Sequence, residues 1–237
     1  MSTSGTAAFN LELTDLIEEA FERCGSELRS GYHFTTARRS LNLLTIEWAN
    51  RGINLWSIEE GLIPLAQGQA VYALPADTID ILESAVRTAS GGVTTDMRLA
   101  RTSATTYAGI TNKASQGRPT QVWVDRQTHA DPPAGPPSLR PLRAVLWPVP
   151  DGAQMALVYW RMRRTQDVAD GSNTVDIPFR FLEALTAGLA YKLAAKLPGV
   201  DPNRAQFLKA EYEEQFQRAA EEDREKADLH ITPRIGR

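Results

Sequence analysis

Residues 178–197, PFRFLEALTAGLAYKLAAKL, decide the fold. One face of this stretch carries apolar side chains at helical spacing, at Phe181, Leu182, Leu185, Leu189 and Leu193. Ala184 and Gly188 leave room for a second helix to approach closely. Charged residues interrupt the stretch within the ~20 residues that a membrane span needs, at Arg180, Glu183, Lys192 and Lys196. The pattern therefore predicts a buried helix of a soluble protein, with no membrane partner.

Helical spacing also marks two stretches near the N-terminus. Residues 10–24 repeat an apolar stripe that ends before Gly25. Residues 35–50 carry a broad apolar face, at Ala37, Leu41, Leu44, Ile46 and Trp48. Thr35 or Thr36 is expected to cap this second helix. Together the two stretches predict a helical hairpin.

A long, highly charged helix is predicted over residues 201–227. Its apolar stripe is thin and consists of Ala205, Leu208, Tyr212, Phe216 and Ala219. The remaining faces must therefore be solvated or ionic. The C-terminal tail, residues 228–237, has no periodicity and contains Pro233 and Gly236, which predicts a flexible segment.

Between the helices, residues 53–164 are rich in β-branched and aromatic side chains and are interrupted by Gly and Pro. The predicted strands are 56–65, 70–74, 79–88, 93–99, 121–126, 142–147 and 154–162. Hairpin turns are expected at 67–69, 91–92 and 150–152, and a short helix at 103–110. Residues 128–141 are rich in proline, which lacks a ladder donor, so they predict an exposed loop.

The order of elements predicts an α+β fold. The N- and C-terminal helix pairs form one bundle, from which an antiparallel β-rich domain projects as an insertion. The expected segments are the N-terminal hairpin 1–52, the β-rich insertion 53–170, the C-terminal helices 171–227 and the flexible tail 228–237.

Composition excludes several classes of protein. The 237 residues carry a formal net charge of −3, which excludes a globally basic nucleic-acid coat. A single cysteine, Cys24, cannot form an intramolecular bridge, and no Cys/His cluster has zinc spacing. A disulfide-rich module and a zinc finger are both excluded, and no metal or other cofactor is expected.

The sequence contains no catalytic signature. It lacks the phosphate loop, the dinucleotide fingerprint, the zinc-protease HExxH and the GxSxG elbow. The histidines His33, His129 and His230 fall in a turn, a loop and the tail, where a solvated ring is expected. Acidic doublets such as Glu59-Glu60 and Glu213-Glu214 could suggest a glycosidase, but adjacent helix positions do not face one another. We therefore predict no catalytic residues, and a packing role for Cys24.

Two basic clusters lie on predicted elements. Arg38 and Arg39 lie on the second helix, whereas Arg161, Arg163 and Arg164 follow aromatic residues in the last strand. A structural or subunit-contact role is the first interpretation. Nonspecific contact with DNA along a channel is the second.

Several stretches together resemble the head-to-tail adaptors, or connectors, of short-tailed bacteriophages, the P22-type tail accessory or head-completion family. They are TARRSLNLLTIEWANRGINLW at 36–56, QAVYALPADTID at 69–80, GRPTQVWVDR at 117–126, LWPVPD at 146–151 and IPFRFLEALTAGLAYKLA at 177–194. These are packing and turn residues in the family's order, and they cover most of the chain.

The resemblance implies a noncatalytic virion protein at the head-to-tail interface, made in the host bacterial cytoplasm. It implies a ring, dodecameric in that family, that docks beneath the portal, extends the DNA channel and receives the tail or nozzle protein. The partners are therefore further copies of the chain, the portal, the tail protein and, nonspecifically, the genomic DNA. The family's portal-gripping extension corresponds to the C-terminal tail, and the residues expected to contact the portal are Leu229, His230, Ile231, Pro233, Ile235 and Arg237.

Residues of the ring can be assigned on the same basis. The subunit interface is expected to use Leu208, Tyr212, Phe216, Arg38 and Arg39. Arg161, Arg163 and Arg164 are candidates for the DNA channel. The alternative for the last helix is that it packs only within its own subunit. Alternatives for the whole protein are a virion-associated cell-wall hydrolase and a glycan-binding tail module.

Overall fold

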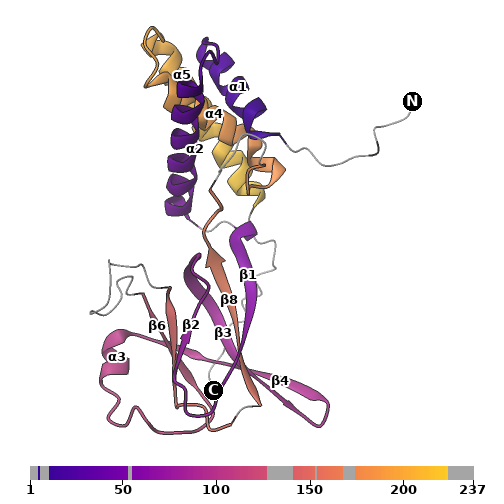
Figure 1. The fold of residues 1–237 in the computed structure, drawn as a ribbon, viewed down its shortest axis with the longest axis vertical. Helices are drawn as coiled ribbons and strands as arrows, with labels where there is room; N and C mark the ends of the chain where they lie inside the picture. The colour runs from indigo at the N-terminus through magenta and orange to yellow at the C-terminus, as the bar shows by residue number, and fades with distance from the viewer. Residues whose placement is uncertain are drawn as a thin grey trace, which may run out of the picture. The chain divides into compact units, whose positions relative to one another are not determined.

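The computed structural model describes Gly5 and residues 11–52, 55–126, 141–152, 154–167 and 174–223. Within them the fold is α+β, and the chain divides into two compact units (Figure 1). The helical unit comprises Met1–Trp56 and Thr165–Arg237, and the β unit is the continuous segment Ser57–Arg164. The helical unit is therefore assembled from both ends of the chain.

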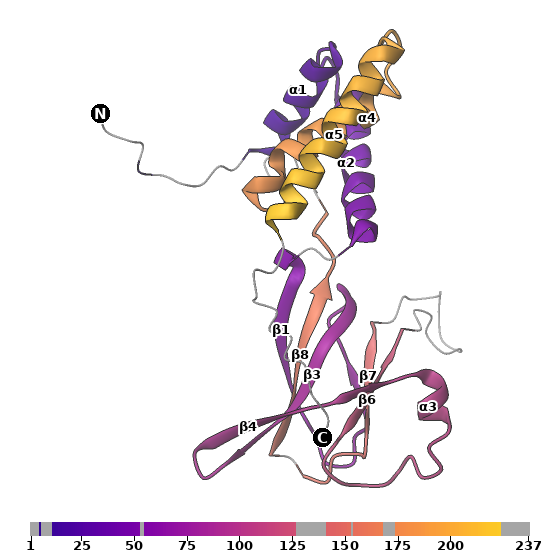
Figure 2. The same ribbon diagram turned by 180° about the vertical axis from the view of Figure 1, so that it is seen from behind.

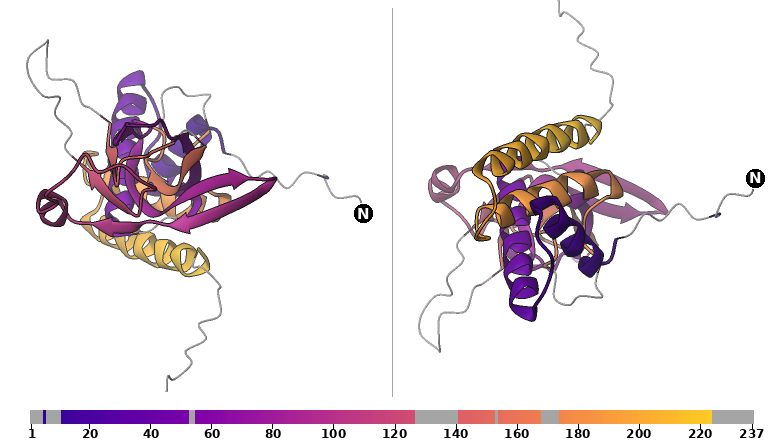
Figure 3. Two further views of the ribbon diagram at one scale, coloured as in Figure 1. Left: turned by 90° about the horizontal axis from the view of Figure 1, so that it is seen from below. Right: turned by 90° about the horizontal axis from the view of Figure 1, so that it is seen from above.

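The helices of the helical unit are α1 (Leu13–Cys24), α2 (Gly31–Arg51), α4 (Leu182–Ala194) and α5 (Pro202–Glu222), with the short 3-10 turn η2 (Phe179–Phe181). A second 3-10 turn, η1 (Leu55–Ser57), spans the boundary between the two units. α4 lies between α5 on one side and α1 and α2 on the other (Figure 3). Their shared core contains the bulky, nearly inaccessible side chains Leu13, Leu16, Ile17, Phe21, Leu41, Leu44, Trp48, Phe181 and Tyr212.

Gly188 explains how closely α4 meets its neighbours. A Cβ at this position would lie 2.8 Å from Leu44 Cδ2 and 2.9 Å from the Tyr212 ring. The close approach predicted for Gly188 is therefore confirmed, and it lets α2 and α5 both pack close to α4 at this position.

The starts of α2 and α5 are each fixed by a side-chain cap. α2 begins four residues earlier than expected, because the Ser30 hydroxyl accepts a hydrogen bond from the His33 backbone N–H at 3.3 Å. Thr35 and Thr36 therefore lie inside the helix. Asp201 caps α5 by accepting from the Asn203 backbone N–H at 2.9 Å, and Pro202 occupies the first turn.

The β unit contains two four-stranded sheets within the described residues. Its strands are β1 (Ile58–Pro64), β2 (Val71–Ala73), β3 (Thr78–Ser90), β4 (Val93–Arg98), β5 (Ala100–Thr102), β6 (Gln121–Asp125), β7 (Arg143–Trp147) and β8 (Met155–Arg163). One sheet has the order β1-β8-β3-β4 and the other β2-β7-β6-β5. The paired strands are antiparallel, as the sequence predicts, except β5 with β6, which are parallel.

One of the three predicted hairpins is confirmed. Gly91 and Gly92, both with positive φ, join β3 to β4, and Figure 2 shows this hairpin reaching beyond the neighbouring strands. The turns at 67–69 and 150–152 were predicted as hairpins, but each connects strands that belong to different sheets. The short helix is confirmed as α3 (Ala104–Ala108), whereas β5 was not predicted. Residues 128–140 of the predicted proline loop, 128–141, lie outside the described residues.

The first sheet is held tightly at Gly61 of β1. Gly61 pairs with Tyr159 of β8, and a Cβ at Gly61 would lie 2.3 Å from the Tyr159 ring. Tyr159 is thereby packed against the β1 backbone and forms part of the core of the β unit, with Leu157, Val86, Ile81, Leu146 and Val122.

Candidate functional site

The described residues contain no group of three or more His, Cys, Asp or Glu side chains that could hold a metal ion. Cys24 is buried at the end of α1, and its thiol donates to the carbonyl oxygen of Ala190 at 3.0 Å. Burial raises the pKa of Cys24 to about 11, which keeps the thiol protonated and unreactive near neutral pH. Cys24 is thus a packing residue, as predicted.

The acidic doublets are engaged in ion pairs. Glu59 lies 2.8 Å from Arg161 and 2.7 Å from Arg163. Glu213 lies 2.7 Å from Arg51, and this hydrogen bond lowers the pKa of the Glu213 carboxyl. A glycosidase acid needs a raised pKa instead. The geometry of these two doublets therefore gives no support to the hydrolase alternative.

The basic cluster of β8 is also engaged within the chain. Arg161 is 9 % exposed and donates to Asp77 at 2.6 Å and to Glu59 at 2.8 Å. The hydrogen bond from Arg161 lowers the pKa of Asp77. Arg163 pairs with Glu59, so the charges of both arginines are largely neutralised. Arg164 is the exposed member of the cluster.

A polar network lies inside the helical unit. Trp48 Nε1 donates to the Tyr212 hydroxyl at 2.9 Å, and that hydroxyl donates to Glu47 Oε1 at 3.1 Å. Lys192 Nζ and Arg51 Nη2 each lie 2.7 Å from the Glu47 carboxylate. Burial alone would raise the pKa of Glu47, but the hydrogen bonds from these partners lower it overall. The network joins α2, α4 and α5.

The residues predicted for the subunit interface occupy different environments. Leu208 and Tyr212 are 2 % and 1 % exposed in the core of their own chain, and the Phe216 ring lies 5.2 Å from that of Trp48. The α5 stripe therefore packs within its own subunit, which was the alternative interpretation of this helix. Arg38 is half-buried and Arg39 is exposed on α2. A neighbouring copy would have to meet other residues of α5.

Large apolar side chains are exposed elsewhere on the same helices. Tyr32, Leu43 and Ile46 of α2 are 73 %, 56 % and 57 % exposed, and Phe207 of α5 is 68 % exposed. Ile46 was predicted in the core, so that assignment is wrong. These residues were not predicted from the sequence as one exposed surface. Tyr32, Arg39 and Ile46 are spaced by seven residues, which places them on the same side of a helix and could have indicated it.

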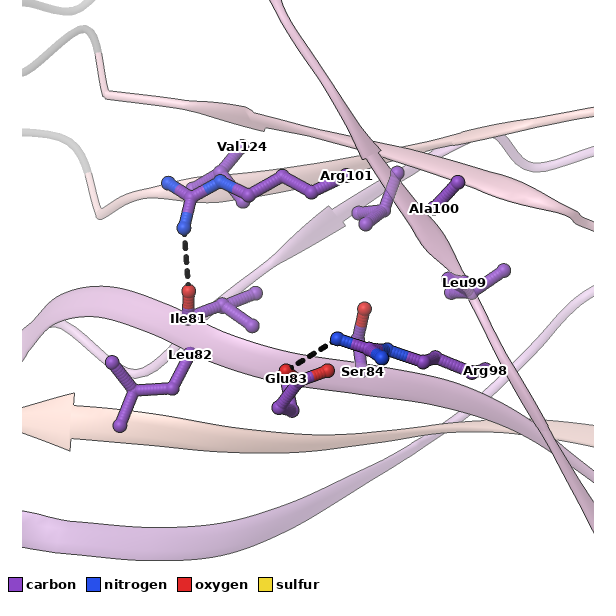
Figure 4. Close-up of a pocket in the computed structure, with 10 residues that line it drawn as sticks. Ile81, Leu82, Glu83, Ser84, Arg98, Leu99, Ala100, Arg101 and Val124 are labelled. Atoms are coloured by element: carbon purple, nitrogen blue, oxygen red, sulfur yellow. Dashed lines mark hydrogen bonds and ion pairs between the residues drawn. The ribbon is translucent and has the colours of Figure 1, made fainter. Parts of the chain in front are cut away.

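A cavity of about 350 Å³ lies in the β unit beside β3, β4 and β5 (Figure 4). Arg101 spans it and donates to the carbonyl oxygen of Ile81 at 2.7 Å. Arg98 pairs with Glu83 at 2.6 Å on its rim. The charged side chains that line the cavity thus pair with each other or hydrogen-bond to the backbone. This arrangement favours a structural role for these residues over a catalytic one.

The residues predicted to bind the portal lie outside the described part of the chain: Leu229, His230, Ile231, Pro233, Ile235 and Arg237. His129 also lies outside it. His33 is described, and its ring stacks on Phe21 with the centroids 5.5 Å apart.

The sequence was compared with models of known protein families and with curated proteins. A family model described as "SU10 adaptor protein" matches residues 12–234, which include segments of both units. No curated protein matches the sequence. Among the helices of the described residues, none combines the length and the apolarity required to cross a membrane.

Proposed function

The chain belongs to the SU10 adaptor protein family, whose members are structural phage adaptors rather than enzymes, and from this premise we propose a specific role in the virion. Copies of the chain form a dodecameric ring at the head-to-tail interface, beneath the portal. The ring extends the DNA channel and offers a platform to the tail or nozzle protein. The family match over nearly the whole chain carries this proposal.

The two units suggest how the parts of the chain divide this role. We propose that the helical unit is the bundle through which copies join and that the β unit is the inserted domain. The exposed apolar side chains Leu43 and Ile46 of α2 and Phe207 of α5 support assembly through the helices, because large apolar residues exposed on a surface often mark contact sites.

The C-terminal tail, residues 228–237, is the proposed portal contact. Leu229, Ile231 and Ile235 alternate with polar residues, a pattern that suits an extended segment added to a sheet edge of a partner. Truncation after Lys226 is expected to weaken binding to the portal. The truncated chain keeps all residues of α5, so loss of portal binding with retained ring formation would assign the tail this role.

Contact with the genomic DNA is proposed for Arg164, because Arg161 and Arg163 are already paired with carboxylates. One phosphate contact per copy gives weak, salt-dependent and nonspecific binding, which suits a channel that must release the genome. Arg164→Ala is expected to reduce retention of duplex DNA by assembled rings at low salt without changing assembly.

The experiment that tests the function mixes the purified chain with the portal protein of the same phage and examines the product by electron microscopy. A new ring beneath the portal supports the proposal. Failure of the full-length chain to associate with that portal at physiological salt contradicts it. Measurable muramidase activity lost on mutation of one glutamate would replace it with the hydrolase alternative.

A further inference from the structure

α2 presents an outward face that the described residues of its own chain leave uncovered. Six residues follow the alternating spacing of four and three that keeps one side of a helix: Tyr32, Thr36, Arg39, Leu43, Ile46 and Asn50. All are exposed except Thr36, which is half-buried. The buried residues of α2, among them Leu41 and Trp48, lie on the opposite side. This outward face combines apolar side chains with one arginine.

α5 presents a second outward face with the same spacing. Its residues are Asn203, Phe207, Ala210, Glu214, Gln217 and Glu221, and all of them are exposed. The buried residues Leu208, Tyr212 and Ala219 lie on the other side of this helix. The outward face of α5 therefore combines an aromatic anchor with two glutamates, of which Glu214 also pairs with the exposed Arg218 one turn along the same helix.

The two faces match each other in an antiparallel alignment. Both helices have 21 residues, about 31 Å at 1.5 Å per residue. Placing Ile46 of one copy against Phe207 of another also places Arg39 against Glu214. Arg39 lies seven residues before Ile46 on α2, and Glu214 lies seven residues after Phe207 on α5, so the two spacings match when the helices run antiparallel. A single alignment of the two helices thus forms both the apolar contact and the ion pair.

The same register pairs the remaining positions sensibly. Leu43 faces the small Ala210, which gives the leucine room to pack. Tyr32 faces Glu221, which can accept a hydrogen bond from the phenol. No position in this alignment opposes two like charges.

The overall charges of the helices favour the same pairing. α2 contains three arginines and one glutamate, whereas α5 contains five glutamates and three basic residues. Opposite charge on the two surfaces speeds encounter and fixes register. A pairing of α5 with α5 would bring acidic surfaces together.

The two faces cannot meet within one chain. α2 and α5 already touch through their inner sides, where Trp48 donates to Tyr212. Each copy therefore offers α2 to one neighbour and α5 to another, which is a heterologous contact that closes into a ring when the rotation allows.

We propose that the α2 outward face of one copy packs antiparallel on the α5 outward face of the next, with Ile46 against Phe207 and Arg39 against Glu214. This inference rests on the proposed ring and names its interface. Leu208, Tyr212 and Phe216 act behind that interface by holding α5 in place.

Charge reversal tests the register. Arg39→Glu and Glu214→Arg each place like charges together and are expected to lower the fraction of chains in rings about tenfold, on the portal or alone. Combining both changes in one chain should restore the rings. Arg29→Glu is the matched control, because Arg29 is exposed on the helical unit but outside both faces. Unchanged assembly in both single variants overturns the inference.

Cross-linking tests the same contact independently. A chain carrying both Ile46→Cys and Phe207→Cys should form a ladder of disulfide-linked oligomers on mild oxidation, whereas Ile46→Cys alone should not. The native Cys24 is buried and does not compete. Rings without a ladder would overturn the interface and leave the adaptor role standing. Absence of rings from the wild-type chain, with and without portal, would overturn both.

Discussion

Replacing Tyr212 by phenylalanine is expected to destabilise the helical unit by about 2 kcal/mol. The lost hydroxyl accepts from Trp48 Nε1 at 2.9 Å. Trp48 is 2 % exposed, so its N–H would be left away from water with no acceptor, which costs about 1–3 kcal/mol. Glu47 also loses one donor but keeps Lys192 and Arg51, so this second loss adds little.

The change is measured by urea unfolding of the full chain, followed by far-UV circular dichroism, which reports mainly the helices. Tyr191→Phe is the matched control. The Tyr191 ring lies 6.5 Å from that of Tyr212, but its hydroxyl is not part of the network. The control should change stability by less than about 0.5 kcal/mol. If Tyr212→Phe behaves like this control, the network does not stabilise the unit and the reasoning is refuted.

Three further outcomes are expected. Gly61→Ala should destabilise the β unit by about 2 kcal/mol, because the new methyl group collides with the Tyr159 ring; hydrogen exchange of the β-unit amides measures it, and unchanged protection contradicts it. The hydrogen bond from Arg161 lowers the pKa of Asp77 in the folded chain. The ionised Asp77 therefore stabilises the β unit fully above the unfolded pKa of about 3.9, and this stabilisation is lost as the pH falls through the lower folded pKa. In Asp77→Asn, the free energy of unfolding of the β unit should therefore fall less steeply as the pH is lowered. The same dependence on pH as in the wild-type chain would contradict a stabilising Asp77–Arg161 pair. Cys24 should resist alkylation at pH 7 until the helical unit unfolds, and labelling of the native chain at the rate of a free thiol would disprove its burial.

The helix boundaries show what local patterns can and cannot predict. The stripes of α1, α4 and α5 were found because apolar residues repeat with the helical period. The first turn of α2 was missed because its start is fixed by the Ser30 cap, while Tyr32 in that turn faces outward. Ile46 was assigned to the core because it lies among buried residues in sequence. Leu44 and Trp48, two residues away on either side, face the core, so Ile46 lies on the opposite face.

The β unit shows the limit of turn chemistry. A Gly or Pro turn predicts that the chain reverses, but it does not predict which strand the next segment will pair with. The segments 67–69 and 150–152 reverse the chain and lead to another sheet. β5 has three residues and pairs in parallel with β6, so it offered no alternation to detect.

The candidate site was predictable only in part, for the same kind of reason. Alternation along β8 predicts which residues of that strand lie on the same face as Arg161. It does not predict that Asp77 lies beside Arg161, because that depends on the pairing of β8 with the distant strand β3. The partners of the arginines therefore required the folded structure.

The discontinuous helical unit has a consequence for how the chain is made. α1 and α2 leave the ribosome first, but the helix that covers both of them, α4, and its neighbour α5 come after the whole β unit. At ~5–20 residues per second, roughly 10 to 30 s of synthesis separate Gly52 from Glu222. During that interval the apolar faces of α1 and α2 lack the cover of α4, whereas the β unit, Ser57–Arg164, is complete before α4 has been synthesised. Nascent chains should therefore complete and fold the β unit before the helical unit, which needs both ends of the chain, can fold.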